Sequence, residues 1–443
     1  MKWRASIAAA VALLAAACSG ASHHAAAGRA HAGSAPRQEL FGFDTYYTAD
    51  ESGLTRVVRL DPVTLREQPF GSLRLGDSVT GHVLSPDRTS LAFGGENDGE
   101  VIVADLVRYD VASRVNVVAN PQPSDGPRIS VFVAAWPRAD RLLGYAEPIA
   151  AHVTYPARFV LVDLVTHRVS RSAPLGGWVV ATAALGDGRA VFLVEPVGAL
   201  GPARLVIADA EGRLRSTMLA NTVPAGVPAA RGDQDVEPGL AVVGDHIYVV
   251  GESDRIADID ASSGRLAYHR VRGLLSQQIL DGPPVDPGSG GVMWMDSRTV
   301  GDAGDGLLYV AGGGVRPARH ETQNQEFTLS AQLVDATSWT VRRTLRNATQ
   351  VAAAHGLYYC WIGDDKFAGN TETFVALRPD GAVAFRRTIP NGTWQISACR
   401  LFETTYVGDR EVDVELDPLT GRVLRQVASL SSYALDLVSW TRP

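Results

Sequence analysis

The chain has 443 residues, with 41 lysines and arginines against 48 aspartates and glutamates, and its formal net charge is −7. No lysine- or arginine-rich run stands out, and a mildly acidic surface repels phosphate backbones. Composition and charge therefore argue against nucleic acid as a partner.

The first 17 residues have the features of an export signal. Lys2 and Arg4 precede an apolar stretch from Ala5 to Ala17, which is too short to span a membrane. The segment 14–18, Leu-Ala-Ala-Ala-Cys, resembles the end of a bacterial lipoprotein signal, in which the cysteine becomes the lipidated first residue. The resemblance implies a lipid on Cys18 that anchors the exported protein to the outer face of the cytoplasmic membrane. Ordinary secretion with an incidental Cys18 is the alternative.

Residues 18–38 are predicted to form a tether between the lipid and a folded domain. They are rich in alanine, glycine, serine and histidine, a composition typical of a flexible linker. His23, His24 and His31 could bind a metal weakly, but we favour the linker and predict no metal site. The predicted folded domain comprises residues 39–443, which is a longer segment than a single hydrophobic core usually contains.

Eight copies of a hairpin-like pattern run through residues 39–443. In each copy a short hydrophobic run ends in a polar turn and restarts as a second β-rich run, which at this scale indicates a propeller or a solenoid. Arg378 closes the first run in one copy, and an aspartate closes it in the others: Asp61, Asp110, Asp163, Asp209, Asp260, Asp335 and Asp417. From the first of these positions to the last the mean spacing is 356/7, about 51 residues, which suits a blade of four strands.

The pattern predicts an all-β propeller of four-stranded blades. The hairpin supplies strands C and D of each blade, and the preceding runs of aliphatic and aromatic residues supply strands A and B. The first hairpin has only one such run before it, while the chain end has a spare one at 431–440. A propeller must close its ring or leave sheet edges open, so we expect the C-terminal strand to complete the first blade. The count favours eight blades, with seven as the alternative.

The turn between strands C and D has a local physical reason. An aspartate at the end of strand C can accept a hydrogen bond from the backbone two residues on, and a later glycine such as Gly264, Gly381 or Gly421 supplies a positive φ. The same aspartates could instead form a ring of carboxylates for metal binding or acid–base chemistry. Because C–D turns lie towards the outer rim of a propeller, we favour the structural role.

Two of these turns carry a longer motif. Residues 260–266 and 417–423 share the form D-x-x-[ST]-G-R-[VL], which resembles the repeats of PQQ-like and surface-layer-type (YVTN-like) β-propellers. The segment 84–93, LSPDRTSLAF, is similar to a TolB-type propeller repeat. The resemblance implies the propeller fold. Quinoprotein dehydrogenases also have a docking tryptophan near the end of this motif and an adjacent cysteine pair. Both are missing from this sequence, so we predict no cofactor.

We expect the binding face where the long connections lie. In a propeller the D–A and B–C loops emerge on one face, and here they include the long segments 147–156, 194–204, 274–290, 314–325 and 363–371. Three D–A loops place a tryptophan shortly after a glycine, at the start of a strand A: Trp178, Trp294 and Trp394. Aromatic planes with N–H donors suit sugars, peptides and other amphipathic ligands. The alternative is that these tryptophans wedge between blades.

Two cysteines remain besides Cys18. We expect Cys360 in strand B of the seventh blade and Cys399 in strand A of the eighth. An exported protein can form disulfides, so these two could be bridged. Stacked sheets lie about 10 Å apart, however, whereas bridged Cα atoms must approach within roughly 7 Å. Two buried free thiols are the favoured alternative.

The sequence favours binding over catalysis. It contains no HExxH, P-loop, GxSxG or zinc-type cysteine motif. We predict a lipid-anchored propeller that acts as a ligand-binding or protein-interaction scaffold at the cell envelope, with an envelope protein, a peptide or a carbohydrate as its partner. The alternative is a propeller enzyme, a hydrolase, lyase or oxidoreductase, with its active site at the channel mouth on the long-loop face. Histidine or acidic side chains converging at that mouth would distinguish the enzyme.

Overall fold

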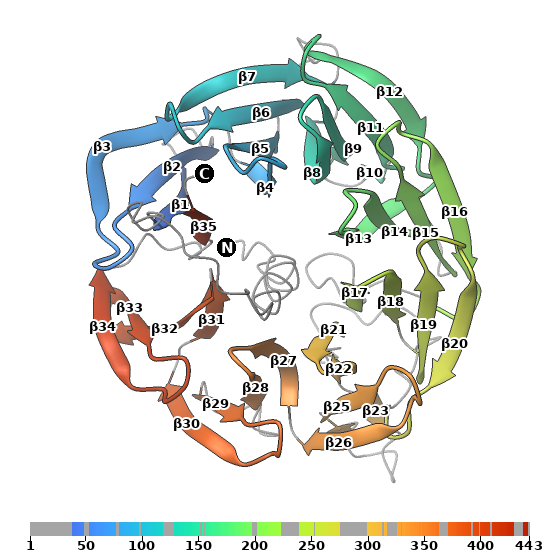
Figure 1. The fold of residues 1–443 in the computed structure, drawn as a ribbon, viewed down its shortest axis with the longest axis vertical. Coiled ribbons are helices and arrows are strands. Elements are labelled where there is room, and N and C mark those ends of the chain that lie inside the picture. The colour runs from blue at the N-terminus through green and yellow to red at the C-terminus, as the bar shows by residue number, and fades with distance from the viewer. Residues whose placement is uncertain are drawn as a thin grey trace, which may run out of the picture. The chain divides into compact units, whose positions relative to one another are not determined.

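The computed structural model describes the strands of the chain, their turns and part of the connections (Figure 1). The described residues are 38–47, 53–76, 79–96, 99–117, 128–150, 153–154, 156–196, 202–222, 239–251, 253–274, 299–311, 314–316, 326–328, 330–346, 348–362, 371–390, 393–397, 399–407, 410–428 and 437–441. They fall into two compact units. The first unit has the described residues of 20–192, 206–215 and 427–443, and the second those of 193–205 and 216–426.

Eight sheets of four strands make up an all-β fold, and they are the blades of an eight-bladed β-propeller. Blade 1 consists of β1 (Gln38–Tyr47), β2 (Gly53–Leu60), β3 (Glu67–Arg74) and β35 (Leu437–Thr441), and blade 2 of β4 (Val79–Leu84), β5 (Ser90–Gly95), β6 (Glu100–Asp105) and β7 (Asp110–Asn116). Blade 3 consists of β8 (Arg128–Arg138), β9 (Arg141–Ala150), β11 (Arg158–Asp163) and β12 (Arg168–Pro174), and blade 4 of β13 (Trp178–Ala184), β14 (Ala190–Glu195), β15 (Ala203–Ala208) and β16 (Leu214–Leu219). Blade 3 also carries the short strand β10 (Val153–Thr154).

Blades 5 to 8 follow the same A–B–C–D order of strands. Blade 5 consists of β17 (Gly239–Val243), β18 (His246–Val250), β19 (Arg255–Asp260) and β20 (Leu266–Arg270), and blade 6 of β21 (Thr299–Gly304), β22 (Leu307–Ala311), β25 (Ser330–Asp335) and β26 (Val341–Arg346). Blade 7 consists of β27 (Ala348–Ala354), β28 (Leu357–Ile362), β29 (Thr371–Leu377) and β30 (Val383–Pro390), and blade 8 of β31 (Thr393–Ser397), β32 (Arg400–Val407), β33 (Arg410–Leu416) and β34 (Val423–Ala428). A small sheet of β23 (Gly314–Arg316) and β24 (Glu326–Thr328) lies between β22 and β25 in the chain.

The first and last described strands meet in blade 1. Strand β35 pairs antiparallel with β1, from Gln38 opposite Thr441 to Gly42 opposite Leu437. The C-terminal strand therefore completes the first blade, and the number of blades is eight rather than seven, as the sequence predicts. In the part of the chain that the structure describes, no helix is long and apolar enough to cross a membrane.

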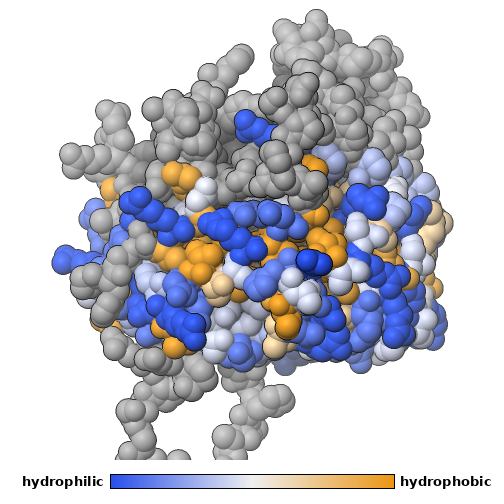
Figure 2. Space-filling model, turned by 90° about the horizontal axis from the view of Figure 1, so that it is seen from above, coloured by the Kyte–Doolittle hydropathy of each residue, from blue (hydrophilic) through white to orange (hydrophobic). Residues whose placement is uncertain are grey.

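The middle strands of the sheets are buried on both faces. All six residues of β14 are buried, and so are five of the six in β5. Since side chains alternate between the faces of a strand, this continuous burial requires a packed neighbour on each side. The D strands β7 and β12 instead have exposed residues along most of their length. Figure 2 accordingly shows a surface in which small hydrophobic groups lie among hydrophilic residues.

The buried side chains form clusters between successive blades instead of one central core. In the first unit Phe41 of blade 1 shares a cluster with Phe93 of blade 2, and Val103 of blade 2 shares another with Val160 of blade 3. In the second unit blades 5 and 6, 6 and 7, and 7 and 8 are joined in the same way. Each blade is thus stabilised by its neighbours, as in other repeat architectures.

The C–D turns share one hydrogen-bonding pattern. In seven blades, Oδ1 of an aspartate at the end of strand C accepts the backbone N–H two residues on, at 2.8 to 3.0 Å. These residues are Asp61, Asp105, Asp163, Asp209, Asp260, Asp335 and Asp417. In blade 7, where Arg378 ends the strand, Oδ1 of Asp380 accepts the N–H of Ala382 at 2.9 Å. The predicted structural role of these aspartates is confirmed.

Blade 2 corrects one position in the predicted repeat. The aspartate that caps its C–D turn is Asp105, whereas Asp110 begins β7 and pairs with Asp105 across the hairpin. The two aspartates are five residues apart, and Leu106 and Val107 between them continue the apolar run in the sequence. The hydrophobic pattern alone therefore places the turn after Asp110, whereas the chain turns after Asp105.

A residue with positive φ completes every C–D turn. It lies three or four places after the residue that ends strand C, with φ between 52° and 84°. The eight residues are Leu65, Tyr109, His167, Gly212, Gly264, Trp339, Gly381 and Gly421. Glycine adopts this left-handed conformation without the steric cost that a Cβ atom brings.

Two of these glycines are also required by the preceding blade. The Phe385 ring of β30 lies against Gly421, and the Arg343 guanidinium of β26 lies against Gly381. In both cases a Cβ atom would overlap the neighbouring side chain. The C–D turn of each of these blades therefore packs against strand D of the blade before it.

Aromatic residues use the same turn position in two other blades. The Trp339 indole stacks on the His269 ring of β20, with centroids 3.8 Å apart and an interplanar angle of 3°. The Tyr109 hydroxyl donates a hydrogen bond of 2.7 Å to the Val57 carbonyl of β2. Here a side chain on the turn reaches back to the preceding blade and provides the contact.

We expect Gly421→Ala to destabilise the protein more than Gly356→Ala. Both glycines have positive φ, 66° and 71°, so each substitution brings a backbone strain of about 1 kcal/mol. A Cβ at position 356 meets no atom within 4 Å, whereas one at 421 displaces the Phe385 ring, which adds roughly 1–3 kcal/mol. Urea unfolding of the two variants measures the difference. Equal losses would show that the Phe385 contact does not constrain the turn.

Candidate binding site

The long-loop face lies largely outside the described residues. Most of the segments 274–290, 314–325 and 363–371 are not described, and neither are Trp294 and Cys18. The predictions made for these two residues therefore remain predictions.

The two other predicted tryptophans have different surroundings. Trp178 begins β13 and is half-buried, directly after a turn in which Gly176 has a φ of 78°. Trp394 in β31 is only 5% exposed, and its ring stacks on Phe374 of β29 with centroids 4.6 Å apart. Trp394 thus packs between blades 7 and 8, which supports the wedge alternative for this residue. The two tryptophans belong to different compact units.

The two described cysteines are not bridged to each other, and the favoured pair of free thiols is wrong for Cys399, which is disulfide-bonded. Cys360 lies in β28, as expected, and is a free, fully buried thiol that packs with Leu345 of blade 6. Cys399 lies in the turn between β31 and β32 instead of in strand A, and its carbonyl accepts a hydrogen bond from Nε2 of His355 at 2.8 Å. Since the Cys360 side chain faces blade 6, it points away from blade 8. Burial raises the pKa of the Cys360 thiol to about 12, which keeps it neutral.

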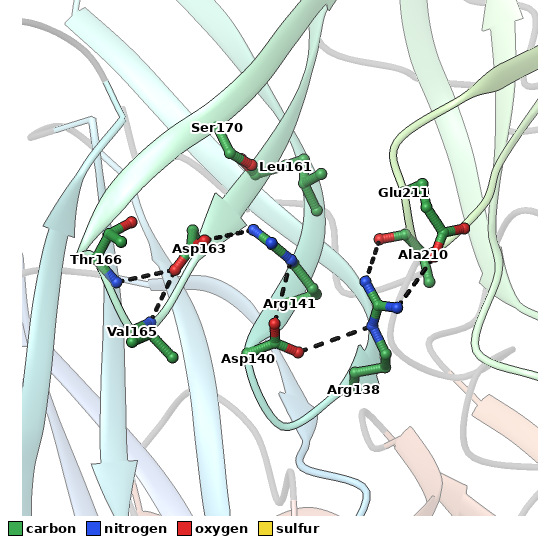
Figure 3. Close-up of polar contacts among 10 residues, drawn as sticks. All are labelled: Arg138, Asp140, Arg141, Leu161, Asp163, Val165, Thr166, Ser170, Ala210 and Glu211. Carbon is green, nitrogen blue, oxygen red and sulfur yellow. Dashed lines mark hydrogen bonds and ion pairs between the residues drawn. The ribbon is translucent and has the colours of Figure 1, made fainter.

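The turn aspartates take part in charge networks at the surface (Figure 3). Asp163 accepts the backbone N–H of Thr166 at 2.9 Å, which lowers the pKa of its carboxyl, and its Oδ2 lies 2.5 Å from Nη1 of Arg141. Arg138, on the neighbouring A–B turn, binds Glu211 of the next C–D turn at 3.0 Å. Asp163 therefore bonds within its own turn, and Glu211 forms an ion pair with Arg138 of the preceding blade.

A recess of about 380 Å³ opens between blades 6 and 7. Figure 1 shows the sheet that ends in β26 beside the sheet that ends in β30. The recess is lined by Arg343, Thr344, Leu345, Arg346, Cys360, Ile362, Val375, Leu377, Gly381, Val383 and Arg386. Its volume is in the range of known small-ligand sites, about 300–1,000 Å³.

The floor of the recess is apolar. Leu345, Cys360 and Val375 are buried, and Val383 at the margin is 53% exposed. These side chains come from three strands of blade 7 and from the D strand of blade 6. The apolar side chains of the floor are therefore packed away from solvent, and Val383 gives the recess its exposed apolar surface.

The rim of the recess is positively charged. Arg343, Arg346 and Arg386 line it, and none of them forms an ion pair within the described ranges. Arg343 donates a hydrogen bond to the Asp380 carbonyl, which holds its guanidinium against the turn of blade 7. Because these arginines have no carboxylate partner among the described residues, this stretch carries a local excess of positive charge on an acidic protein.

A second ionisable cluster lies between blades 5 and 6. Oδ1 of Asp258 in β19 is 2.6 Å from Nδ1 of His246, and its Oδ2 is 3.6 Å from Nε2 of His269. His246 follows the A–B turn and Asp258 lies near the C–D turn, at the end of the blade opposite the D–A and B–C loops. Burial beside Trp339 lowers the pKa of His269.

The recess was not predicted from the sequence, whose long connections indicated binding on the loops instead. A signal was present: the segment Arg-Arg-Thr occurs in two successive D strands, at 342–344 and 386–388. Only the packing of one blade on the next shows which of these arginines lie over a common apolar floor. A sequence pattern read one blade at a time does not contain that information.

We expect His269→Phe to reduce the loss of stability on acidification. A folded-state pKa below the unfolded value of about 6.5 means that the unfolded chain binds the proton first, so stability falls as the pH drops through that value. Phenylalanine keeps the stacking on Trp339 but cannot titrate. Urea unfolding at pH 8 and pH 5.5 measures the change, with the exposed His167→Phe as control. The same pH dependence in wild type and His269→Phe would contradict this assignment.

Known proteins share the fold. No protein-family model matches the chain, and no curated protein matches its sequence. Among solved structures, the dihydro-heme d1 dehydrogenase NirN is 11% identical, with a TM-score of 0.52 over 88% of this chain and 72% of that one. A europium-containing methanol dehydrogenase is also 11% identical, with a TM-score of 0.50 over 83% of this chain and 80% of that one. At this identity the similarity shows the fold alone, an eight-bladed β-propeller.

Proposed function

We propose that this protein is an exported, lipid-anchored β-propeller that binds a ligand or a partner protein at the cell envelope. The observation that carries the proposal is the recess between blades 6 and 7, in which an apolar floor is bordered by three arginines without ion-pair partners among the described residues. An apolar pocket with a few placed polar groups is the usual form of a binding site.

The charges of the recess support binding because a bound anion would form charge-assisted hydrogen bonds with arginines that have no ion-pair partner among the described residues. Other arginines of the second unit do form ion pairs, such as Arg387 with Glu403 at 2.7 Å and Arg270 with Asp254 at 2.6 Å.

The N-terminal sequence supports a position at the cell envelope. The signal-like residues 1–17 and the cysteine that follows them support export and lipidation, with the outer face of the cytoplasmic membrane as the site of anchoring. The alternative of an enzyme places its catalytic groups on the long-loop face. The pair of His246 and Asp258 lies at the opposite end of its blade, which supports binding over catalysis for the described part of the chain.

We expect Cys18→Ala to release the protein from the membrane fraction or to leave its signal uncleaved. The physical reason is that the thiol is the proposed attachment point of the only anchor. Fractionation and gel mobility in the native host measure the effect, with Cys360→Ala as the matched cysteine control. A variant that fractionates and migrates like the wild type would refute lipidation.

We expect a ligand of the recess to raise the melting temperature of the wild-type protein in a thermal-shift screen of cell-wall sugars, peptides and small metabolites. A ligand that binds only the folded state stabilises it by mass action. Arg386→Gln should lose the shift, while Arg342→Gln, on strand D of blade 6 and paired with Asp335 at 2.6 Å, should keep it. Loss of the shift in Trp178→Ala alone would move the site to Trp178. No shift with any compound would argue against the binding function.

A further inference from the structure

On the basis of the proposed lipid anchor, we propose that the C–D turns of blades 1 to 3 contact the surface of the membrane that holds the anchor. The turns supply exposed aliphatic side chains, and the tether predicted for residues 18–38 joins the domain at the same face. The face of these blades that carries their D–A and B–C loops is then directed away from the lipid.

Aliphatic side chains are exposed at the tips of three successive turns. Val63, Val107 and Val165 each lie two residues after the aspartate that ends strand C, and they are 67%, 43% and 73% exposed. All three blades belong to the first unit. In Figure 1 the outer strands into which these turns lead, β3, β7 and β12, follow one another along the edge of this unit. The turns thus present a row of apolar groups to solvent.

The fold does not require apolar residues at this position. Only the backbone N–H is used by the turn, and Glu211, Ser262 and Thr337 form the same hydrogen bond in blades 4, 5 and 6. In the second unit Leu419 of blade 8 has the corresponding position and is 54% exposed. A single exposed aliphatic residue needs no explanation, but its recurrence at one position of the repeat does. We attribute the valines to a contact outside the domain.

The N-terminal tether enters the domain on the same face as these turns. Gln38 begins β1, and Leu40 of that strand pairs with Leu60 of β2. Leu60 is followed directly by Asp61, which caps the C–D turn. The chain before Gln38 therefore continues from the end of blade 1 that carries Val63.

The length of the tether favours this face as the one nearer to the lipid. Gln38 lies 20 residues after Cys18, and a linker of that length has a mean span of about 25 Å. The eight residues of β2 span about the same distance from one face of blade 1 to the other. A linker of average extension thus keeps the C–D turns at the membrane, whereas the opposite face would require it to pass along the whole blade.

A membrane surface suits the distribution of these side chains. The valines occur one to a blade, so they fit a broad surface better than a single peptide or small molecule. The charges beside them have both signs: Arg66 and Glu67 follow the first turn, and Arg108 lies 3.8 Å from Asp105 in the second. The contact is therefore mainly apolar, at the boundary of headgroups and acyl chains. The anchor keeps the turns close to the lipid, so several weak contacts are sufficient.

The test places a fluorescent label near either end of one strand. Val165→Cys, just beyond the turn end of β11, and Arg158→Cys, at its opposite end, are labelled with the fluorophore NBD on the full-length lipidated protein. Of the described cysteines, Cys360 is buried and Cys399 is disulfide-bonded, so neither takes the label. The protein is reconstituted into phosphatidylcholine vesicles that contain nitroxide lipids. We expect quenching at position 165 and none at position 158, because the nitroxide quenches only a label that reaches the lipid.

Removal of the other two valines gives a second readout. In the Val63→Ser/Val107→Ser background, quenching at position 165 should fall about twofold or more, because the row loses most of its apolar contact. Met218→Ser removes an exposed apolar side chain from strand D of blade 4 and should leave the quenching unchanged. Anionic phosphatidylglycerol should also change it little, since the charges beside the valines have both signs. Thermal melting checks that all variants are folded.

Equal quenching at the two positions, or quenching that the serine substitutions do not reduce, would overturn the inference while the anchor stands. Protection of the label in native membranes but not in vesicles would assign the turns to a protein partner and would overturn it too. If the comparison with Cys18→Ala shows that the chain carries no lipid, the anchor fails and the inference fails with it.

Discussion

The aspartate that ends strand C and the positive-φ residue after it act together, because the first fixes the direction of the turn and the second fixes its position against the preceding blade. The carboxylate accepts backbone N–H groups, and the hydrogen bonds from Ser263 and Thr420 help to lower the pKa of Asp260 and Asp417. The left-handed residue then brings the turn into contact with the preceding blade: with its strand D where Gly381, Gly421 or Trp339 occupies that place, and with its strand C where Tyr109 does. Strand order within the blade, burial of the middle strands and packing between blades all depend on this turn.

Because the same contact is made with different residues, neighbouring blades do not meet identically. At the interface of blades 7 and 8 an aromatic ring fills the space above the turn glycine, and an ion pair lies beside it. At the interface of blades 6 and 7 an arginine occupies that space, and the ion pair is replaced by a leucine and a cysteine. The repeat therefore specifies the frame of each interface, while a few substitutions decide whether the interface is filled or left open to solvent.

The features predicted correctly from the sequence are those that depend on residues close together in the sequence or on the number of strands. The turn aspartates and the glycines at 264, 381 and 421 are local, and the spare strand at the chain end follows from counting strands. Asp110 was chosen wrongly because two aspartates near one turn satisfy the same pattern, and only the hydrogen bonds of Asp105 decide between them. The sequence left two settings open for Trp394 and gave no prediction of the recess, because each is formed by residues of two blades whose relative register is not encoded in either repeat alone.

The pairing of β35 with β1 has a consequence for how the chain reaches its final state. These strands lie at opposite ends of the folded domain, so their contact has nearly the largest sequence separation the chain allows. Such contacts form slowly, because a long loop must close before any pairing energy is gained. Until β35 has been synthesised, β1 remains an unpaired sheet edge, the kind of edge to which other chains can add. Truncation near the C-terminus would leave the molecule permanently in that aggregation-prone condition.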